Sequence, residues 1–113
     1  MTPSTTTTRP SRVLPAYVPP DPPGYPAAQL AGALSVRDGC VYLDGDDTLL
    51  IWYPGTHLST EDGHTIVVSP SGDRIGVVGE KVVLGGGYVE RTAPMLSELE
   101  TTCTARQLAV VAP

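Results

Sequence analysis

Basic residues are scarce in this sequence. Seven lysines and arginines stand against twelve aspartates and glutamates, and the formal net charge at pH 7 is −5. Two of the basic residues, Arg9 and Arg12, lie within the first 20 residues, so the remainder is more acidic than the total suggests. A surface that binds nucleic acid requires clustered Lys and Arg side chains to neutralise phosphates. The composition therefore argues against a nucleic acid as the partner.

Long apolar runs are also lacking. The longest, such as residues 49–53 (LLIWY), are far shorter than the roughly 20 apolar residues that cross a bilayer as a helix. The N-terminus shows no apolar segment of the signal-peptide type. We therefore expect no membrane association and a chain made in the cytoplasm.

Cysteine and histidine are rare, with two residues of each. Cys40 and Cys103 lack the paired spacing and neighbouring histidines of a zinc site, so we expect no metal ion. They form either one disulfide across the domain or two buried free thiols, and both alternatives stay open. His57 and His64 lie in or beside a polar loop, but the chain has no Gly-x-Ser-x-Gly nucleophile elbow. We expect no catalytic residues and no enzymatic activity.

Proline and threonine are abundant, and they concentrate at the N-terminus. Residues 1–26 hold eight of the twelve prolines, which predicts an extended arm or linker outside the core, followed by a small domain over residues 27–113. Aromatic side chains in such an arm need a surface to rest on, and its arginines can dock on an acidic protein. The candidate partner contacts are Arg9, Arg12, Tyr17, Tyr25 and, in the domain, Trp52.

From residue 30 onward, short apolar segments alternate with turn signals, the pattern of an all-β sandwich or barrel. Asp38-Gly39 predicts a tight hairpin turn of the primed type, and Pro94 predicts the start of a short helix over residues 94–102. The predicted strands are residues 33–37, 40–43, 48–53, 64–69, 74–78, 81–84, 88–92 and 106–112.

Residues 48–53 (TLLIWY) are apolar on both faces of the expected strand. Leu49 and Ile51 point one way, and Leu50 and Trp52 point the other. A face in contact with water should instead carry polar residues. We expect this second face to be covered by the short helix, by the N-terminal arm or by another protein.

Two segments resemble ligand sites at first sight. Gly85–Gly87 are followed by Tyr88-Val89-Glu90, without the Lys and the Ser or Thr of a phosphate-binding loop, so they predict a bend in a closed sheet and no cofactor. The acidic turn at residues 44–47 lacks the glycine and glutamate positions of an EF-hand. It predicts a solvated hairpin turn.

Several segments occur in a familiar order: residues 38–43 (DGCVYL), 49–55 (LLIWYPG), 62–68 (DGHTIVV), 72–87 (GDRIGVVGEKVVLGGG) and a late cysteine. In this the chain resembles a family of small, mostly uncharacterised bacterial and phage domains. The resemblance implies a five- to seven-stranded antiparallel, OB-like barrel with paired cysteines at Cys40 and Cys103. Tyr53, between Trp52 and Pro54, departs from the family pattern, as does the arm in place of an export signal.

Together these features predict a non-enzymatic structural or interaction protein. We expect an accessory protein of a bacteriophage virion, in the head or tail, assembled in the host cytoplasm and anchored by its N-terminal arm. Its partners would be other protein subunits of the capsid or tail, including further copies of itself. The alternative is a secreted or cell-surface bacterial binding module on a Thr/Pro stalk.

Overall fold

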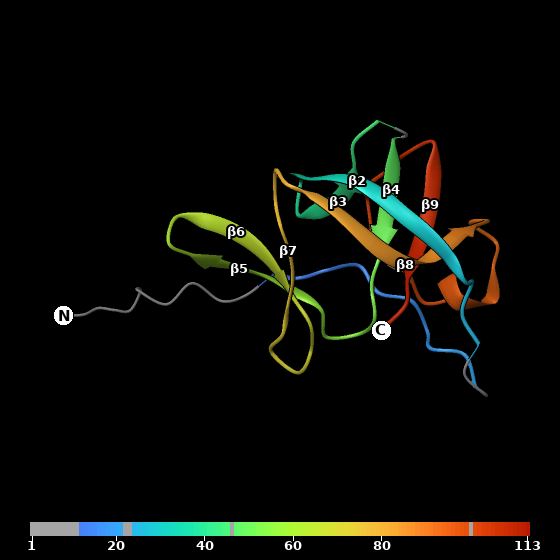
Figure 1. The fold of residues 1–113 in the computed structure, drawn as a ribbon. Helices are drawn as coiled ribbons and strands as arrows, with labels where there is room; N and C mark the ends of the chain where they lie inside the picture. Colours follow the sequence, from blue (N-terminus) through green and yellow to red (C-terminus); the bar gives the residue numbers. More distant parts are fainter. Residues whose placement is uncertain (1–11, 22–23, 46, 100) are drawn as a thin grey trace.

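In the part of the chain that the structure describes, nine strands and one 3-10 helix make up the fold (Figure 1). The computed structural model describes residues 12–21, 24–45, 47–99 and 101–113. The strands are β1 (Arg12–Val13), β2 (Ala28–Arg37), β3 (Cys40–Leu43), β4 (Thr48–Ile51), β5 (His57–Glu61), β6 (His64–Val68), β7 (Arg74–Val77), β8 (Lys81–Val89) and β9 (Gln107–Val111), and the 3-10 helix is η1 (Pro94–Leu96). The all-β prediction is confirmed.

Five of the strands close into a barrel in the order β2-β3-β4-β9-β8, with β8 paired to β2. The barrel prediction is confirmed, but the expectation that it is antiparallel throughout is wrong, because β4 and β9 pair in parallel. A closed ring with an odd number of strands cannot alternate in direction all the way round. The last strand of the barrel, β9, lies between β4 and β8. It is parallel to β4 and antiparallel to β8.

The triple glycine lies within β8, where that strand changes partner. Residues 81–86 pair with β2, and residues 86–89 pair with β9, so Gly86 belongs to both ladders. A Cβ atom on Gly86 would clash with the carbonyl oxygen of Val110, and the φ angle of 148° is one that favours glycine. A Cβ on Gly87 would clash with Pro26. The glycines therefore lie in a closed sheet, as predicted, but inside one continuous strand. The strand predicted over residues 81–84 and the start of the one predicted over residues 88–92 are both part of β8.

A smaller sheet, in the order β1-β5-β6-β7, lies beside the barrel (Figure 1). Leu58 of β5 and Val67 of β6 belong to the same buried cluster as Leu34 and Leu50 of the barrel interior. The two sheets therefore share one core. The β5–β6 hairpin ends in a tight turn at Asp62 (φ 50°) and Gly63 (φ 80°), which matches the turn at Asp38 and Gly39 that the sequence predicts.

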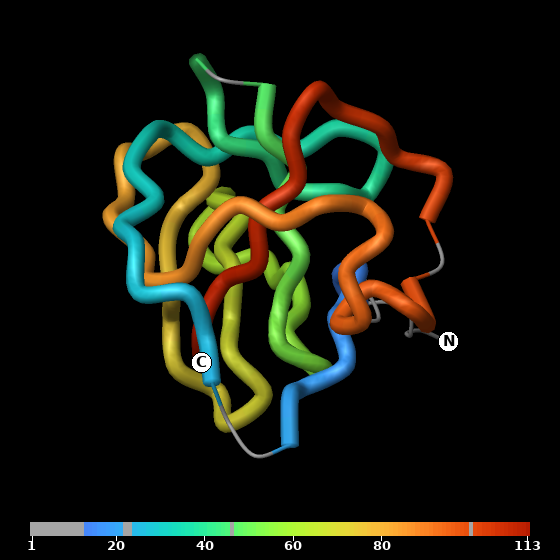
Figure 2. Tube along the Cα trace, turned by 90° about the vertical axis from the view of Figure 1, so that its right-hand side faces the viewer, coloured from blue at the N-terminus to red at the C-terminus, as the bar shows by residue number. Residues whose placement is uncertain are grey.

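A second buried cluster covers the outer face of β3, β4 and β9. Leu49 and Ile51 of β4 contribute to it, whereas Leu50 and Trp52 face the barrel interior. The cover consists of Tyr17 from the N-terminal region and Leu96 and Cys103 from the segment between β8 and β9. The sequence left three possible covers open for the second apolar face of residues 48–53. Two segments of the chain itself bury this face (Figure 2, blue and orange).

The helix predicted over residues 94–102 is reduced to η1, a single 3-10 turn. Beyond the turn at Ser97 and Glu98, the described residues up to 105 follow an irregular path. This path carries Cys103 to Cys40, at the start of β3, and lays Leu96 and Leu99 on the barrel. Tertiary contacts thus override the local helical preference of this segment.

Candidate functional site

Residues 12–18, which we call the N-terminal strap, join three parts of the structure through backbone hydrogen bonds. Arg12 and Val13 pair with Leu58 and His57 in the small sheet. The strap then continues past residues 52 and 56 to η1. The bonds run from Leu14 N–H to Thr56 O (3.0 Å), from Trp52 N–H to Pro15 O (2.9 Å), from Tyr17 N–H to Trp52 O (3.1 Å) and from Val18 N–H to Met95 O (2.7 Å).

Two side chains anchor the strap. Leu14 joins the barrel core, and Tyr17, only 2% exposed, joins the outer cluster. The Tyr17 hydroxyl donates a hydrogen bond to the carbonyl of Val111 (2.7 Å), and its ring meets those of Tyr25 and Tyr53 edge to face. Burial, with a smaller contribution from Tyr25, raises the pKa of Tyr17 well above its usual value.

This arrangement corrects two expectations about the arm. The first quarter of the chain does not stay outside the core, because Leu14 and Tyr17 are buried in it. Tyr17 and Trp52, expected to contact a partner, are instead enclosed by the chain's own residues. Tyr25 is half-buried against Tyr17. Arg9 and the side chain of Arg12 lie outside what the structure describes.

The slot that receives the strap consists of the residues that pair with it or bond to it, namely Trp52, Thr56, His57, Leu58, Met95 and Val111. The sequence did not predict this slot. Leu14 and Tyr17 belong to VLPAYV, the one apolar segment among the prolines of residues 1–26. This apolar segment is the feature of the sequence that could have predicted a strand packed on the domain. Beside the strap lies a shallow groove of about 640 Å³, whose lining includes Val13 (70% exposed), Ala16, Glu98, Thr101 and the two cysteines.

Cys40 and Cys103 form a disulfide, so the structure takes the first of the two alternatives that the sequence left open. The bond fixes the segment between β8 and β9 to the start of β3. Thr101 supports this junction, because its hydroxyl accepts the backbone N–H of Cys103 (3.0 Å). The disulfide therefore holds down one of the two segments that cover the outer face of the barrel.

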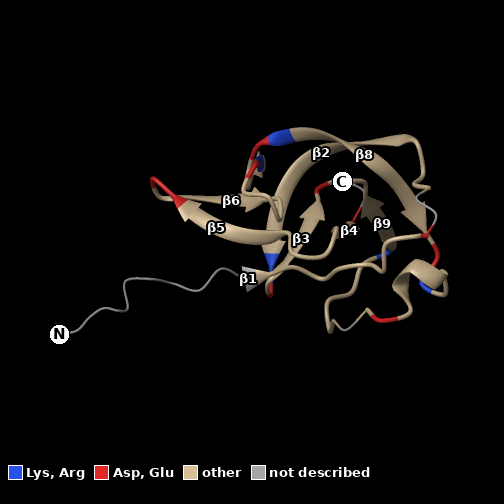
Figure 3. Cartoon of the chain, turned by 90° about the horizontal axis from the view of Figure 1, so that it is seen from below, with Lys and Arg blue, Asp and Glu red and all other residues tan. Residues whose placement is uncertain are grey.

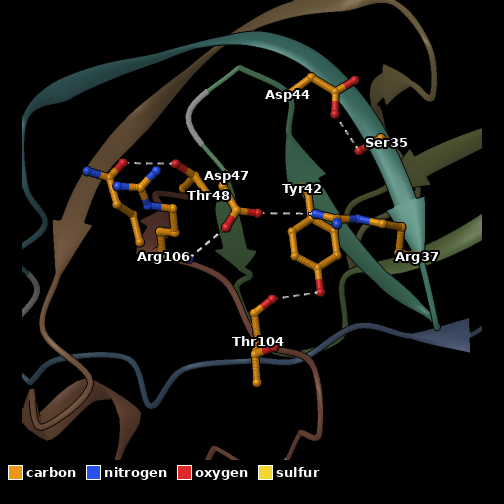
Figure 4. Close-up of polar contacts among 9 residues, drawn as sticks. Ser35, Arg37, Tyr42, Asp44, Asp47, Thr48, Thr104 and Arg106 are labelled. Atoms are coloured by element: carbon orange, nitrogen blue, oxygen red, sulfur yellow. Dashed lines mark hydrogen bonds and ion pairs between the residues drawn. The ribbon is translucent and has the colours of Figure 1, made fainter.

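Polar side chains around the acidic turn tie neighbouring strands together (Figure 4). The Asp47 carboxylate accepts hydrogen bonds from the guanidinium of Arg37 (3.4 Å) and from the backbone N–H of Arg106 (3.0 Å). Arg37 also stacks over the ring of Tyr42, with its Cζ atom 3.9 Å from the ring centroid. The hydroxyl of Tyr42 donates to the carbonyl of Thr104 (3.3 Å). These contacts give the turn a positioning role within the fold.

The same region holds a polar pair of which one partner, Thr48, is buried and the other, Gln107, is exposed. Thr48 is fully buried, and its hydroxyl donates to Oε1 of Gln107 (3.2 Å) across the parallel β4–β9 pair. On the other side of the turn, Ser35 donates to Asp44 (2.8 Å). The first contact joins the neighbouring strands β4 and β9. The second joins β2 to the turn between β3 and β4 (Figure 4).

The two histidines do not come together. The expected loop around them is a hairpin instead, in which His57 begins β5 and His64 begins β6. His57 is opposite Val68, and His64 is opposite Glu61 at the acidic tip of the hairpin (Figure 3). Nδ1 of His57 lies 3.0 Å from the carbonyl oxygen of Gly55. Among the described residues, no group of three or more His, Cys, Asp or Glu side chains is placed to hold a metal ion.

Within the described ranges, no helix is long and apolar enough to cross a membrane. Comparison with known proteins adds no relative: no protein-family model matches the chain, and no curated protein or solved structure is significantly similar to it.

Proposed function

We propose that this chain is a non-enzymatic structural protein that attaches to other protein subunits through its N-terminal region. The observation that carries the proposal is the way the strap is held. The β1–β5 pairing, four further backbone hydrogen bonds and two buried anchors, Leu14 and Tyr17, seat it on the domain. Strand addition of this kind is a general mode of attachment between protein chains.

We further propose that the barrel is OB-like. The strand order β2-β3-β4-β9-β8, the parallel pairing of the third and fifth barrel strands and the long β2 that pairs with both β3 and β8 support this. In OB-folds, the outer face of the second and third strands is a ligand surface. In this chain the corresponding face, on β3 and β4, is buried by Tyr17, Leu96 and Cys103. Attachment would then rely on the N-terminal region rather than on that face.

The setting we propose is a bacteriophage virion, with the chain as an accessory protein of the head or tail. A small crosslinked β domain with a Pro/Thr-rich N-terminal region suits a particle that assembles in cytosol and then persists outside cells. The proposal predicts that the chain copurifies with intact particles in a fixed ratio to the major capsid protein. Quantitative mass spectrometry of purified particles tests this, and absence of the chain from the particles would contradict it.

The disulfide also favours a second candidate, a secreted or cell-surface binding module on a Thr/Pro stalk. That function predicts glycosylated threonines among residues 5–8, because segments rich in threonine and proline are typical sites of such modification. Intact-mass measurement of the protein from its natural source distinguishes the two candidates. An unmodified mass, with the chain absent from envelope and culture-medium fractions, would exclude this alternative.

A further inference from the structure

Apart from Tyr25, whose ring meets that of Tyr17 from within the connection to β2, the residues that hold the strap are distant from it in sequence. Its backbone partners run from Trp52 to Met95, and the hydroxyl of Tyr17 bonds to Val111, 94 positions away. None of these contacts depends on the covalent connection between the strap and β2. The slot therefore recognises the strap as it would recognise the same segment of another chain.

The connection from the strap to β2 is rich in proline. Residues 19–27 read PPDPPGYPA and include five prolines. Proline-rich linkers favour extended conformations and act as semi-rigid spacers. Extended linkers between an exchangeable element and its domain suit exchange between copies, which is a low-cost route to association.

We propose that the strap is an exchangeable strand, and that in the assembled state the strap of one copy occupies the slot of a second copy of this chain. The exchanged strap would make the same four backbone hydrogen bonds and bury Leu14 and Tyr17 in the same places. This inference rests on the proposed function, because it identifies the neighbour that the N-terminal region grips.

Mass action sets when exchange occurs. The tether presents each strap to its own slot at an effective concentration on the order of millimolar, as short linkers do. An isolated chain at micromolar concentration therefore keeps its strap in its own slot. Exchange needs either a local concentration as high as that in an assembly or refolding at high protein concentration.

A mixed-cysteine experiment tests the exchange on the full chain. Val13 and His57 are directly opposite each other in the β1–β5 ladder, and Val13 is exposed. One preparation carries Val13→Cys and another, with a mass tag, carries His57→Cys. The two are unfolded together, refolded at high concentration and mildly acidic pH, and then oxidised. A Val13→Cys chain can bond to a His57→Cys chain at this site only when the strap of one lies in the slot of the other.

The matched control uses Thr60→Cys and Thr65→Cys, which are opposite each other in the β5–β6 hairpin of the same sheet. A hairpin this short does not exchange its strands separately, so this pair reports random thiol coupling. We expect the Val13–His57 heterodimer, measured by intact mass, in at least several-fold excess over the control heterodimer, with a yield that rises with refolding concentration. Equal yields from the two pairs, or no Val13–His57 heterodimer, would overturn the exchange.

The two proposals fail separately. A chain that copurifies with particles but gives no Val13–His57 heterodimer would refute exchange and leave the structural role in place. A specific heterodimer from a chain that is absent from particles would support exchange and refute the virion setting.

Discussion

The hydroxyl of Tyr17 and the carbonyl of Val111 form a buried hydrogen bond of 2.7 Å, which links the N-terminal strap to the last strand of the barrel. The two residues are 94 positions apart, and the contact places a polar group of the strap beside the barrel wall. Because the bond joins the strap to β9, its loss should weaken the hold on the strap and lower the stability of the folded domain.

Replacing Tyr17 with Phe tests this bond. The change leaves the Val111 carbonyl without its side-chain donor, and we expect the free energy of unfolding to fall by about 1–2 kcal/mol. Chemical denaturation followed by tryptophan fluorescence measures the change. Tyr88→Phe is the control, because Tyr88 is 49% exposed, and should change stability by less than about 0.5 kcal/mol. Equal effects of the two substitutions would show that the Tyr17 bond contributes nothing.

The raised pKa of Tyr17 predicts a loss of stability at high pH. Because the folded state favours the protonated phenol, its contribution is complete below the unfolded pKa of about 10 and is lost as the pH rises above it. Denaturation series at neutral pH and near pH 11 should show a larger loss for the wild type than for Tyr17→Phe. Parallel pH profiles for the two proteins would refute this assignment.

Two neighbouring glycines of β8, Gly85 and Gly86, should differ sharply in their tolerance of alanine. Gly86→Ala places a methyl group against the Val110 carbonyl at a φ of 148°, and we expect a loss of about 3 kcal/mol or more. A Cβ at Gly85 meets no atom within 4 Å, so Gly85→Ala should be neutral or stabilising by about 0.5 kcal/mol. Melting temperatures of the two variants measure this contrast, and similar values would contradict the close approach of Gly86 to the Val110 carbonyl.

The disulfide should contribute a large part of the stability. It joins residues 63 positions apart, and the loss of such a loop constraint costs about 4 kcal/mol in the chain-entropy model. We expect the Cys40→Ala/Cys103→Ala protein to unfold at a much lower denaturant concentration than the oxidised wild type. Addition of a dithiol reductant should lower the stability of the wild type but not that of the double variant. A double variant as stable as the wild type would refute this role.

Much of the barrel could be predicted from the sequence because local patterns report local geometry. Asp38-Gly39 marks a turn that requires positive φ, and both residues adopt it. The alternation of Leu49 and Ile51 against Leu50 and Trp52 places them correctly on two faces. The glycines of β8 lack the flanking residues of a phosphate loop, and they lie in the wall of the closed barrel.

Other features depend on contacts between distant residues, which no local pattern contains. β5 (HLSTE) has only one large apolar residue, Leu58, and became a strand because β1 and β6 pair with it on both sides. Residues 94–102 look helical, but Leu96 and Cys103 are held against the barrel along an irregular path. The strap shows the same effect, since composition identified its prolines but not the slot that binds Leu14 and Tyr17.

The position of β9 between β4 and β8 has a consequence during synthesis. A ribosome releases the strands in chain order, and the edges of β4 and β8 that flank the gap stay open until residues 107–111 emerge. Open strand edges invite pairing with other chains. Nascent chains that stall before this point should be aggregation-prone and should require chaperones. In chains that include β9, this strand pairs with the open edges of both β4 and β8.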